Sequence, residues 1–209
     1  MQKGDFVRVA FSGKLKEGGQ PLDSSESTPL VLGERWVIVG IDDALLSMNV
    51  GEKKTIELEP DKAFGPRDAS MIRLVPEAEF KKHGTKPYPG MMINADNLHG
   101  RVLTVSSGRV KVDFNHPLSG KTVIYDLSIN EKIEKPEDKV KALLEYYSRV
   151  HVKDLKVTIH NKDVEVIVPP MINSVMKKKA ADDIMKYLGM ENVKFSEVYL
   201  RRHEEEKKE

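Results

Sequence analysis

Apolar side chains grouped around one acid are the part of this sequence that could do chemistry. A site of this composition would be an apolar concavity with a single carboxylate and no evident nucleophile. It therefore suits a reaction that makes or breaks no covalent bond, and rotation about the peptide bond before a proline is the obvious candidate. The runs that carry these side chains are Phe11-Ser12-Gly13, Pro21-Leu22-Asp23-Ser24-Ser25, Leu32-Gly33, Val37-Ile38-Val39-Gly40-Ile41 and Ala63-Phe64-Gly65.

The order of these runs resembles that of the FKBP-type peptidyl-prolyl isomerases. A later run, Asn115-His116-Pro117-Leu118-Ser119-Gly120-Lys121, belongs to the same pattern. Within this family the chain is most similar to the SlyD-like and archaeal long branch, which carries a chaperone domain inserted in the flap. The resemblance covers roughly residues 1–133, and residues 135–209 lie outside it.

The resemblance implies a proline pocket and gives a role to individual residues. Asp23 would be the lone acid at the pocket edge, facing the substrate carbonyl or the twisting nitrogen, and the backbone N–H of Ile38 would hold a substrate carbonyl. Phe64 and Tyr125 would complete the catalytic set. The substrate-binding lining would be formed by Phe11, Leu22, Leu30, Val37 and Ile41.

Three positions depart from the family pattern. Phe11 and Phe64 stand where many members have tyrosine, and Ile41 stands where the best-known members have tryptophan at the pocket floor. The missing hydroxyl at Phe64 removes a donor to ligand carbonyls, so we expect weaker binding of macrolides such as FK506. Isomerisation is expected to survive because the apolar character is retained. The substitutions also keep an alternative open, a chaperone or protein-binding module with little or no turnover.

Each of these residues has a plainer interpretation when it is taken alone. Apolar residues at strand or helix spacing, such as Phe11 and Ile41, usually pack in a core. Asp23 before two serines is typical of a turn or a cap. The joint order of the residues favours the isomerase hypothesis over core packing.

Composition limits the classes of protein to which the chain can belong. Its 209 residues, 39% of them apolar, predict one to three domains with modest cores. Basic and acidic residues number 34 and 33, so no overall charge indicates a nucleic-acid or membrane partner. The lack of cysteine excludes disulfides and thiol catalysis. Because the N-terminus lacks the apolar core of a signal peptide and no stretch approaches the ~20 apolar residues of a membrane span, we expect a cytoplasmic protein.

Strands must position most of the expected pocket. Residues 6–11 and 53–59 alternate between apolar and polar side chains, as half-buried strands do. Residues 41–48 have apolar side chains at helical spacing, and they form the only convincing helix in the first half of the chain. Together with the resemblance, the pattern predicts an α+β fold of FKBP type, in which a mostly antiparallel sheet wraps on one short helix.

From about residue 72 the sequence changes to short segments rich in Met and Val and broken by Pro and Gly. Residues 101–105 and 109–114 predict a hairpin, and residues 122–129 return as a strand. An excursion that leaves and rejoins one sheet is an inserted domain, because its two ends must lie close together. We therefore expect an isomerase domain at residues 1–71 and 114–134, an inserted mostly-β flap domain at residues 72–113 and a C-terminal α+β domain at residues 135–209.

The resemblance to the SlyD-like branch implies that the insert binds unfolded chains and delivers their prolines to the pocket. The expected partners are therefore unfolded or partly folded, proline-containing polypeptides. Methionine and aromatic side chains supply an adaptable apolar surface, and about half of the apolar set should fill the insert's own core. The set comprises Met71, Ile72, Leu74, Val75, Phe80, Tyr88, Met91, Met92 and Leu98.

Residues 135–209 predict the order helix, strand, strand, helix, strand. The elements are expected at residues 137–148, 155–160, 163–168, 174–188 and 193–200, after a charged linker over residues 131–136. For this domain we consider protein interaction, dimerisation or client holding. An alternative is a tether to RNA or the ribosome, which the basic runs Lys177-Lys178-Lys179 and Arg201-Arg202 would provide. This alternative is the weaker one, because nearby acidic residues offset the positive charge.

Six histidines raise the question of a metal site. None of them is paired with another histidine at ligand spacing, and no cysteine accompanies them, so we expect no metal and no cofactor. The histidine- and cysteine-rich tail of bacterial relatives is also absent from the sequence. Nickel handling is therefore not carried over to this chain.

Overall fold

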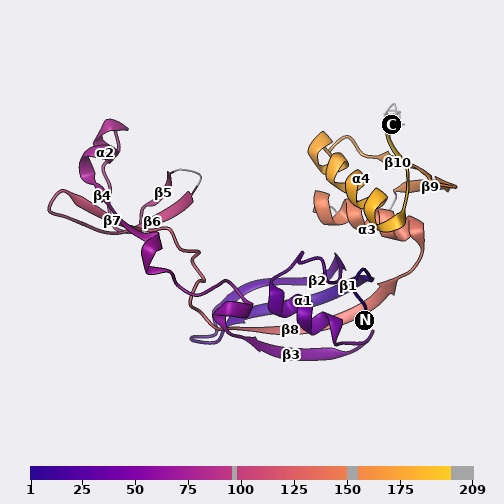
Figure 1. Ribbon diagram of the computed structural model, residues 1–209, viewed down its shortest axis with the longest axis horizontal. Coiled ribbons are helices and arrows are strands. Elements are labelled where there is room, and N and C mark those ends of the chain that lie inside the picture. The colour runs from indigo at the N-terminus through magenta and orange to yellow at the C-terminus, as the bar shows by residue number, and fades with distance from the viewer. Residues whose placement is uncertain (96–97, 150–154, 199–209) are drawn as a thin grey trace, which may run out of the picture. The chain divides into compact units, whose positions relative to one another are not determined.

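The computed structural model describes residues 1–95, 98–149 and 155–198 (Figure 1). The chain divides into two compact units, which are described separately below. Unit 1 comprises Met1–Gly13, Asp23–Ile56 and Asp126–Glu209, and unit 2 comprises Lys14–Leu22 and Glu57–Tyr125. Among the described residues, no helix is both long enough and apolar enough to cross a membrane.

Unit 1 contains most of a four-stranded sheet with the strand order β2-β1-β8-β3. Its strands are β1 (Phe6–Leu15), β2 (Pro21–Val31), β3 (Lys53–Leu58) and β8 (Val123–Ile133). Side chains alternate along β8, where Leu127 and Ile129 are buried and Asp126 is exposed. The strands predicted at residues 6–11 and 53–59 are therefore confirmed. Strand β2 was not predicted, because six of its first eight residues are polar and show no alternation of apolar and polar side chains.

Helix α1 (Val39–Leu46) follows the sheet's first hairpin. It begins and ends two residues earlier than the predicted range 41–48, because the carbonyl of Ile38 already accepts the N–H groups of Ile41 and Asp42 at 3.0 and 3.2 Å. The helix buries Ile41 and Leu45. After it, Gly51 turns with a φ of 82° and donates its N–H to the Ile129 carbonyl at 2.7 Å, which ties the turn to the sheet.

The rest of unit 1 is a small α+β layer formed after β8. Helices α3 (Pro136–Ser148) and α4 (Ser174–Leu188) contain the predicted ranges, and strands β9 (Lys156–His160) and β10 (Asp163–Val168) form the predicted antiparallel hairpin. Strand β11 (Asn192–Glu197) pairs with β10 in parallel, because α4 carries the chain back to the start of the sheet. Residues 199 and 200 of the strand predicted at 193–200, and the basic run Arg201-Arg202, lie outside the described residues.

Two expectations for this region are wrong. The helical spacing of apolar residues in 174–188 predicts that Val175 lies on the same buried face as Ala180 and Ile184, but Val175 is 62% exposed. The first half of the charged linker expected at residues 131–136 is strand, because β8 continues to Ile133. Ile133 is buried and belongs to the same core as Leu143 and Val166, so the strand passes directly into the core of the C-terminal layer.

Unit 2 contains a second four-stranded sheet, with the order β4-β7-β6-β5. Its elements are β4 (Ile72–Pro76), α2 (Glu77–Lys82), β5 (Met92–Ala95), β6 (Leu98–Ser106) and β7 (Arg109–Asp113). Short 3-10 helices at Pro60–Lys62 and Ala69–Met71 precede them. The predicted hairpin is confirmed, since Ser106 pairs with Arg109. Ile72 pairs with Asp113, so the two ends of this segment lie next to each other.

The second sheet packs around its own small core. Phe80 from α2 and Phe114 are buried with three valines from β6 and β7. Gly100 makes this packing possible, because a Cβ at that position would lie 2.7 Å from the Phe114 ring and from a Val112 methyl group. Helix α2 was not predicted, so the expectation of a single helix in the first half of the chain is wrong.

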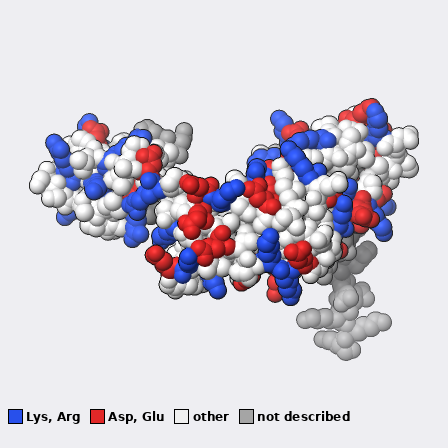
Figure 2. Space-filling model, turned by 60° about the horizontal axis from the view of Figure 1, so that its bottom comes forward, with Lys and Arg blue, Asp and Glu red and all other residues white. Residues whose placement is uncertain are grey.

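Charged side chains are scattered over the visible face of the molecule without separating by sign. Figure 2 shows basic and acidic side chains interspersed over both units. Many charged side chains of the described residues form ion pairs at the surface, such as Lys16 with Glu57 and Lys82 with Glu79. Such pairs contribute little to stability, and the mixed pattern gives no large field of one sign on this face.

Candidate functional site

The residues expected to form a proline pocket belong to both units. Their convergence on one cavity stays a prediction, and each group is described within its own unit. Unit 1 holds Phe11, Asp23, Leu30, Val37, Ile38 and Ile41, and unit 2 holds Leu22, Phe64 and Tyr125.

In unit 1, the backbone of Ile38 is held at the start of α1. Ile38 is the N-cap residue, with φ −57° and ψ 147°, and its carbonyl is fixed by two helical N–H groups. Within the described part of the chain, no acceptor is hydrogen-bonded to the N–H of Ile38. Val37 and Ile38 are both half-buried. This donor is therefore fixed and has no acceptor among the described residues, and it lies next to partly exposed apolar side chains, which suits the recognition of a carbonyl group.

Asp42 holds the loop that leads to this donor. It is 1% exposed, and it is the one charged side chain classed as buried among the described residues. Its carboxylate accepts the N–H of Gly33 at 2.9 Å and the N–H of Arg35 at 3.2 Å. Arg35 has a positive φ of 58°, and its guanidinium donates to Asp43 at 2.8 Å. These bonds fix residues 33–35 immediately before the segment from Trp36 to Ile38.

The other expected residues of unit 1 differ in exposure. Leu30 and Ile41 are 3% and 6% exposed, so only a small part of each side chain can contact a ligand. Phe11 is half-buried on β1, and Asp23 is exposed on β2. Only Phe11 and Asp23 of these four therefore present a substantial part of the side chain to a bound molecule.

In unit 2, Phe64 lies in a turn that hydrogen bonds hold in place. The N–H of Gly65 donates to the Pro60 carbonyl at 2.8 Å, and the Gly65 carbonyl accepts the N–H of Gly120 at 2.9 Å. The hydroxyl of Ser119 donates to the Phe64 carbonyl at 3.2 Å. The run from Asn115 to Lys121 therefore supports Phe64 through its backbone.

His116 also supports Phe64 through its ring. The two rings are parallel, with centroids 4.9 Å apart, and His116 Nδ1 accepts the N–H of Leu118 at 3.2 Å. One face of the half-buried Phe64 ring is thus covered by His116. Of the other expected residues in this unit, Tyr125 is 2% exposed and Leu22 is half-buried.

Asp42 and His116 are residues whose importance the sequence analysis missed. The helical pattern includes Asp42, but it gives no sign of the hydrogen bonds that this side chain accepts from Gly33 and Arg35 of the preceding loop. His116 was recognised as part of a family motif and was given no role. Its contact with Phe64 joins residues that are far apart in the sequence, which local patterns do not reveal.

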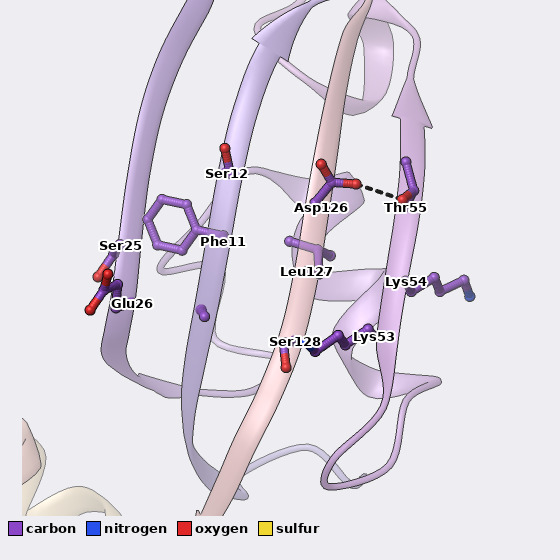
Figure 3. Close-up of a pocket in the computed structure, with 11 residues that line it drawn as sticks. Phe11, Ser12, Ser25, Glu26, Lys53, Lys54, Thr55, Asp126, Leu127 and Ser128 are labelled. Atoms are coloured by element: carbon purple, nitrogen blue, oxygen red, sulfur yellow. Dashed lines mark hydrogen bonds between the residues drawn. The ribbon is translucent and has the colours of Figure 1, made fainter.

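A separate hollow of about 500 Å³ lies on the outer face of the first sheet (Figure 3). Its polar side chains include Ser12, Ser128 and Asp126, and the Asp126 carboxylate accepts a hydrogen bond from the Thr55 hydroxyl. Asp126 and Ser128 alternate with the buried Leu127 and Ile129, so they point away from the core. Of the expected pocket residues only Phe11 lines this hollow, and the hollow is therefore distinct from the predicted proline pocket.

Histidine and carboxylate side chains do not cluster in the part of the chain that the structure describes. No group of three or more of them, or of cysteines, is placed to hold a metal ion there.

Three family models match successive parts of the chain. The model described as FKBP-type peptidyl-prolyl cis-trans isomerase matches residues 1–83. The model of the FKBP26 IF domain matches residues 73–118, and the model of the FKBP26 C-terminal region matches residues 136–200.

Individual proteins are similar to this chain over 57–63% of its length. A short-type peptidyl-prolyl cis-trans isomerase of Methanocaldococcus jannaschii is 28% identical over 148 residues, which cover 63% of this chain and 93% of that protein. An FKBP-type 16 kDa peptidyl-prolyl cis-trans isomerase of Escherichia coli is 32% identical over 142 residues, which also cover 63% of this chain and 93% of that protein. The SlyD isomerase of Helicobacter pylori is 29% identical over 124 residues, or 57% of this chain and 66% of that protein.

Proposed function

Because this chain belongs to the FKBP-type peptidyl-prolyl cis-trans isomerases, we propose that its site is built around the Ile38 N–H, Asp23, Phe64 and Tyr125. The proposed apolar lining is Phe11, Leu22, Leu30, Val37 and Ile41. The observation that carries this assignment is the Ile38 donor, which is fixed by α1 and has no acceptor among the described residues.

An apolar site accelerates rotation by favouring the twisted amide over the planar one. The barrier of ~18–20 kcal/mol arises because rotation breaks amide resonance. At the halfway geometry the C–N bond is single, and the group has lost much of the charge separation that water solvates. Removing water therefore destabilises the planar form more than the twisted form. A thousandfold acceleration requires only about 4 kcal/mol, which shape, desolvation and one or two hydrogen bonds can supply.

The proposed residues divide this task between them. The Ile38 N–H holds a substrate carbonyl, so that the chain on one side of the bond stays fixed while the other side turns. Phe64, covered on one face by His116, offers a rigid aromatic wall to the proline ring. Asp23 supplies the single negative charge near the rotating amide. None of these steps requires a cofactor.

The test is an isomerisation assay on a short X-Pro peptide with Asp23→Ala and Phe64→Ala. Both variants should lower kcat/KM by about tenfold, since each removes an interaction worth about 1–2 kcal/mol. Asp126→Ala is the matched control, because it deletes a carboxylate on the outer face of the same sheet. It should keep wild-type activity.

The same assay separates this proposal from its rival. An active wild type whose kcat/KM is unchanged in both variants would place catalysis elsewhere. An inactive wild type would favour a chaperone or binding module that has lost turnover.

For the insert we propose a holdase role on unfolded, proline-containing polypeptides. Leu74, Tyr88 and Met92 are 61%, 62% and 61% exposed, which is unusual for large apolar side chains. A hollow of about 510 Å³ lies in the same unit, and Met92 lines it together with Phe80, Met91, Ile93 and Phe114. Flexible methionines in such a surface adapt to varied apolar side chains of a client.

The edge of the insert's sheet supports the same proposal. Strand β5 is the last strand in the order β4-β7-β6-β5, and Met92 and Ile93 belong both to this edge and to the hollow. An extended client can pair with such an edge while its side chains enter the hollow. We place the function in the cytoplasm, where newly made chains expose their prolines.

A further inference from the structure

Trp36, which precedes the proposed substrate-binding residues Val37 and Ile38, is stacked on the C-terminal helices. Its ring lies 4.1 Å from the Tyr146 ring of α3, at an interplanar angle of 29°. The Tyr146 hydroxyl also donates to the Trp36 carbonyl at 3.3 Å. Tyr147 and Tyr187 complete the surroundings, with ring centroids 6.0 and 6.4 Å from Trp36.

A second contact holds the same loop two residues earlier. The Glu34 carboxylate accepts hydrogen bonds from Lys186 at 2.6 Å and from the Tyr187 hydroxyl at 2.9 Å, both on α4. The Lys186 ammonium is the main reason that the pKa of Glu34 lies below its usual value. The side chain of Glu34 is only 18% exposed, so this contact is partly shielded from water.

The C-terminal helices are themselves anchored on the first sheet. Arg8 of β1 forms a two-pronged ion pair with Glu145, the residue before Tyr146, at 3.1 and 2.8 Å. Both side chains are less than one fifth exposed, which strengthens a charge-assisted pair of this geometry. Phe6 and Val31 of the sheet also lie in the same buried cluster as Leu143 and Leu144 of α3.

The loop before Ile38 is therefore held from two directions. Asp42 of α1 binds the N–H groups of Gly33 and Arg35, and the C-terminal helices bind Glu34 and Trp36. Resting on the site proposed above, we propose that the C-terminal region positions the substrate-binding segment, and that Tyr146 is a positioning residue for the Ile38 donor.

The physical reason lies in the cost of ordering a loop. A donor that is already in place binds a carbonyl without first losing conformational freedom, whereas a loose donor loses it at every binding event. Weakening the contact between Trp36 and Tyr146 should therefore raise KM for a peptide more than it lowers kcat. General destabilisation does the reverse, because it reduces the number of active molecules and leaves KM unchanged.

The experiment uses the full chain with Tyr146→Ala, Tyr146→Phe and a control, Phe195→Leu. Phe195 lies on β11 and packs on the same core, but it makes no ring contact with Trp36 in the described structure. Trp36 is the only tryptophan of the sequence, so intrinsic fluorescence reports directly on its surroundings. For each variant, kcat and KM for a short X-Pro peptide are measured together with the fluorescence.

Tyr146→Ala should change the Trp36 emission and raise KM by about five- to tenfold. Tyr146→Phe keeps the stacked ring and should stay within about twofold of the wild type. Phe195→Leu should keep both the emission and KM. The proposal is overturned if Tyr146→Ala changes the emission and leaves KM unaltered, or if Phe195→Leu raises KM to the same extent.

Glu34→Ala provides a second test if Tyr146→Ala does not fold. It removes the partly shielded carboxylate and releases Lys186 and Tyr187 from the loop, so a smaller rise in KM with altered emission is expected. An unchanged KM contradicts the proposal. Failure of the underlying site is recognised separately. In that case the wild type is active but Asp23→Ala and Phe64→Ala keep full activity, whereas failure of the positioning role leaves those two variants impaired.

Discussion

At Ile38 the main chain supplies the proposed donor, so an ordinary side-chain substitution cannot remove it. Proline can, because it has no N–H and requires a φ near −65°. Ile38 already has a φ of −57°, and its N–H makes no bond to another described residue. Ile38→Pro therefore deletes the donor with little strain on the backbone.

We predict that Ile38→Pro lowers kcat/KM on an X-Pro peptide by about tenfold relative to Ile38→Ala. Ile38→Ala is the matched control, since it loses the side chain and keeps the N–H. Thermal unfolding of both variants checks that α1 is intact. Equal activity in the two variants would show that the amide does not bind substrate.

Some residues of the site could be predicted from sequence and others could not. Phe64 and Ile38 were singled out because they stand in short motifs whose order resembles a family. Trp36 was not, because its role depends on Tyr146, 110 residues away. Periodicity describes spacing along one element, and it contains no information on which distant side chain meets a given ring.

At the scale of elements, periodic helices and hairpins were the predictable part. Helix α4 (Ser174–Leu188) has the predicted bounds, because it begins after an Asn cap and ends at Gly189 in the left-handed region. Helix α2 has six residues, too few to show a helical period. The parallel pairing of β10 with β11 depends on the path of the chain through α4, and strand patterns alone do not give it.

The pairing of Ile72 with Asp113 allows the insert to be removed without opening the rest of the chain. We predict that replacing residues 72–113 by a short glycine linker spares isomerisation of short peptides, because the proposed site residues all lie outside this range. The same deletion should abolish any acceleration of refolding of a proline-containing protein. Equal effects on both assays would contradict the division of labour.

A point variant tests the same division without a deletion. Met92→Glu places a charge on the exposed apolar edge of the insert and leaves the rest of the insert in place. Val50→Glu is the matched control, since Val50 is also an exposed apolar side chain, 48% exposed, and lies outside the insert. Only Met92→Glu should weaken client holding, measured as suppression of aggregation of an unfolded protein.

At the scale of the whole molecule, the contact of Glu34 with the C-terminal helices should respond to acid. Its pKa is lowered in the folded state, chiefly by the hydrogen bond from Lys186, from an ordinary value of 4.5. A lowered pKa means that the contact stabilises the protein above that value, and that this stabilisation is lost as the pH falls through the lower, folded-state pKa.

We predict a change in Trp36 emission below pH 4.5 that Glu34→Gln reduces. The amide cannot be protonated in this range, so it removes the titration at that position. Glu165→Gln is the control, because Glu165 also has a lowered pKa but pairs with Lys194 on β11. If the wild type, Glu34→Gln and Glu165→Gln all show the same change in emission with acid, the change arises from other carboxylates.

The shared core also has a consequence for how such a chain can change in evolution. Phe6, Val31 and Trp36 belong to the first sheet and its loop, yet they are covered by side chains that arrive more than 100 residues later. A descendant that lost its last third would expose three large apolar groups in one patch. Loss of the C-terminal region therefore has to be accompanied by polar replacements at these three positions. Gain of such a region has to be accompanied by apolar replacements there.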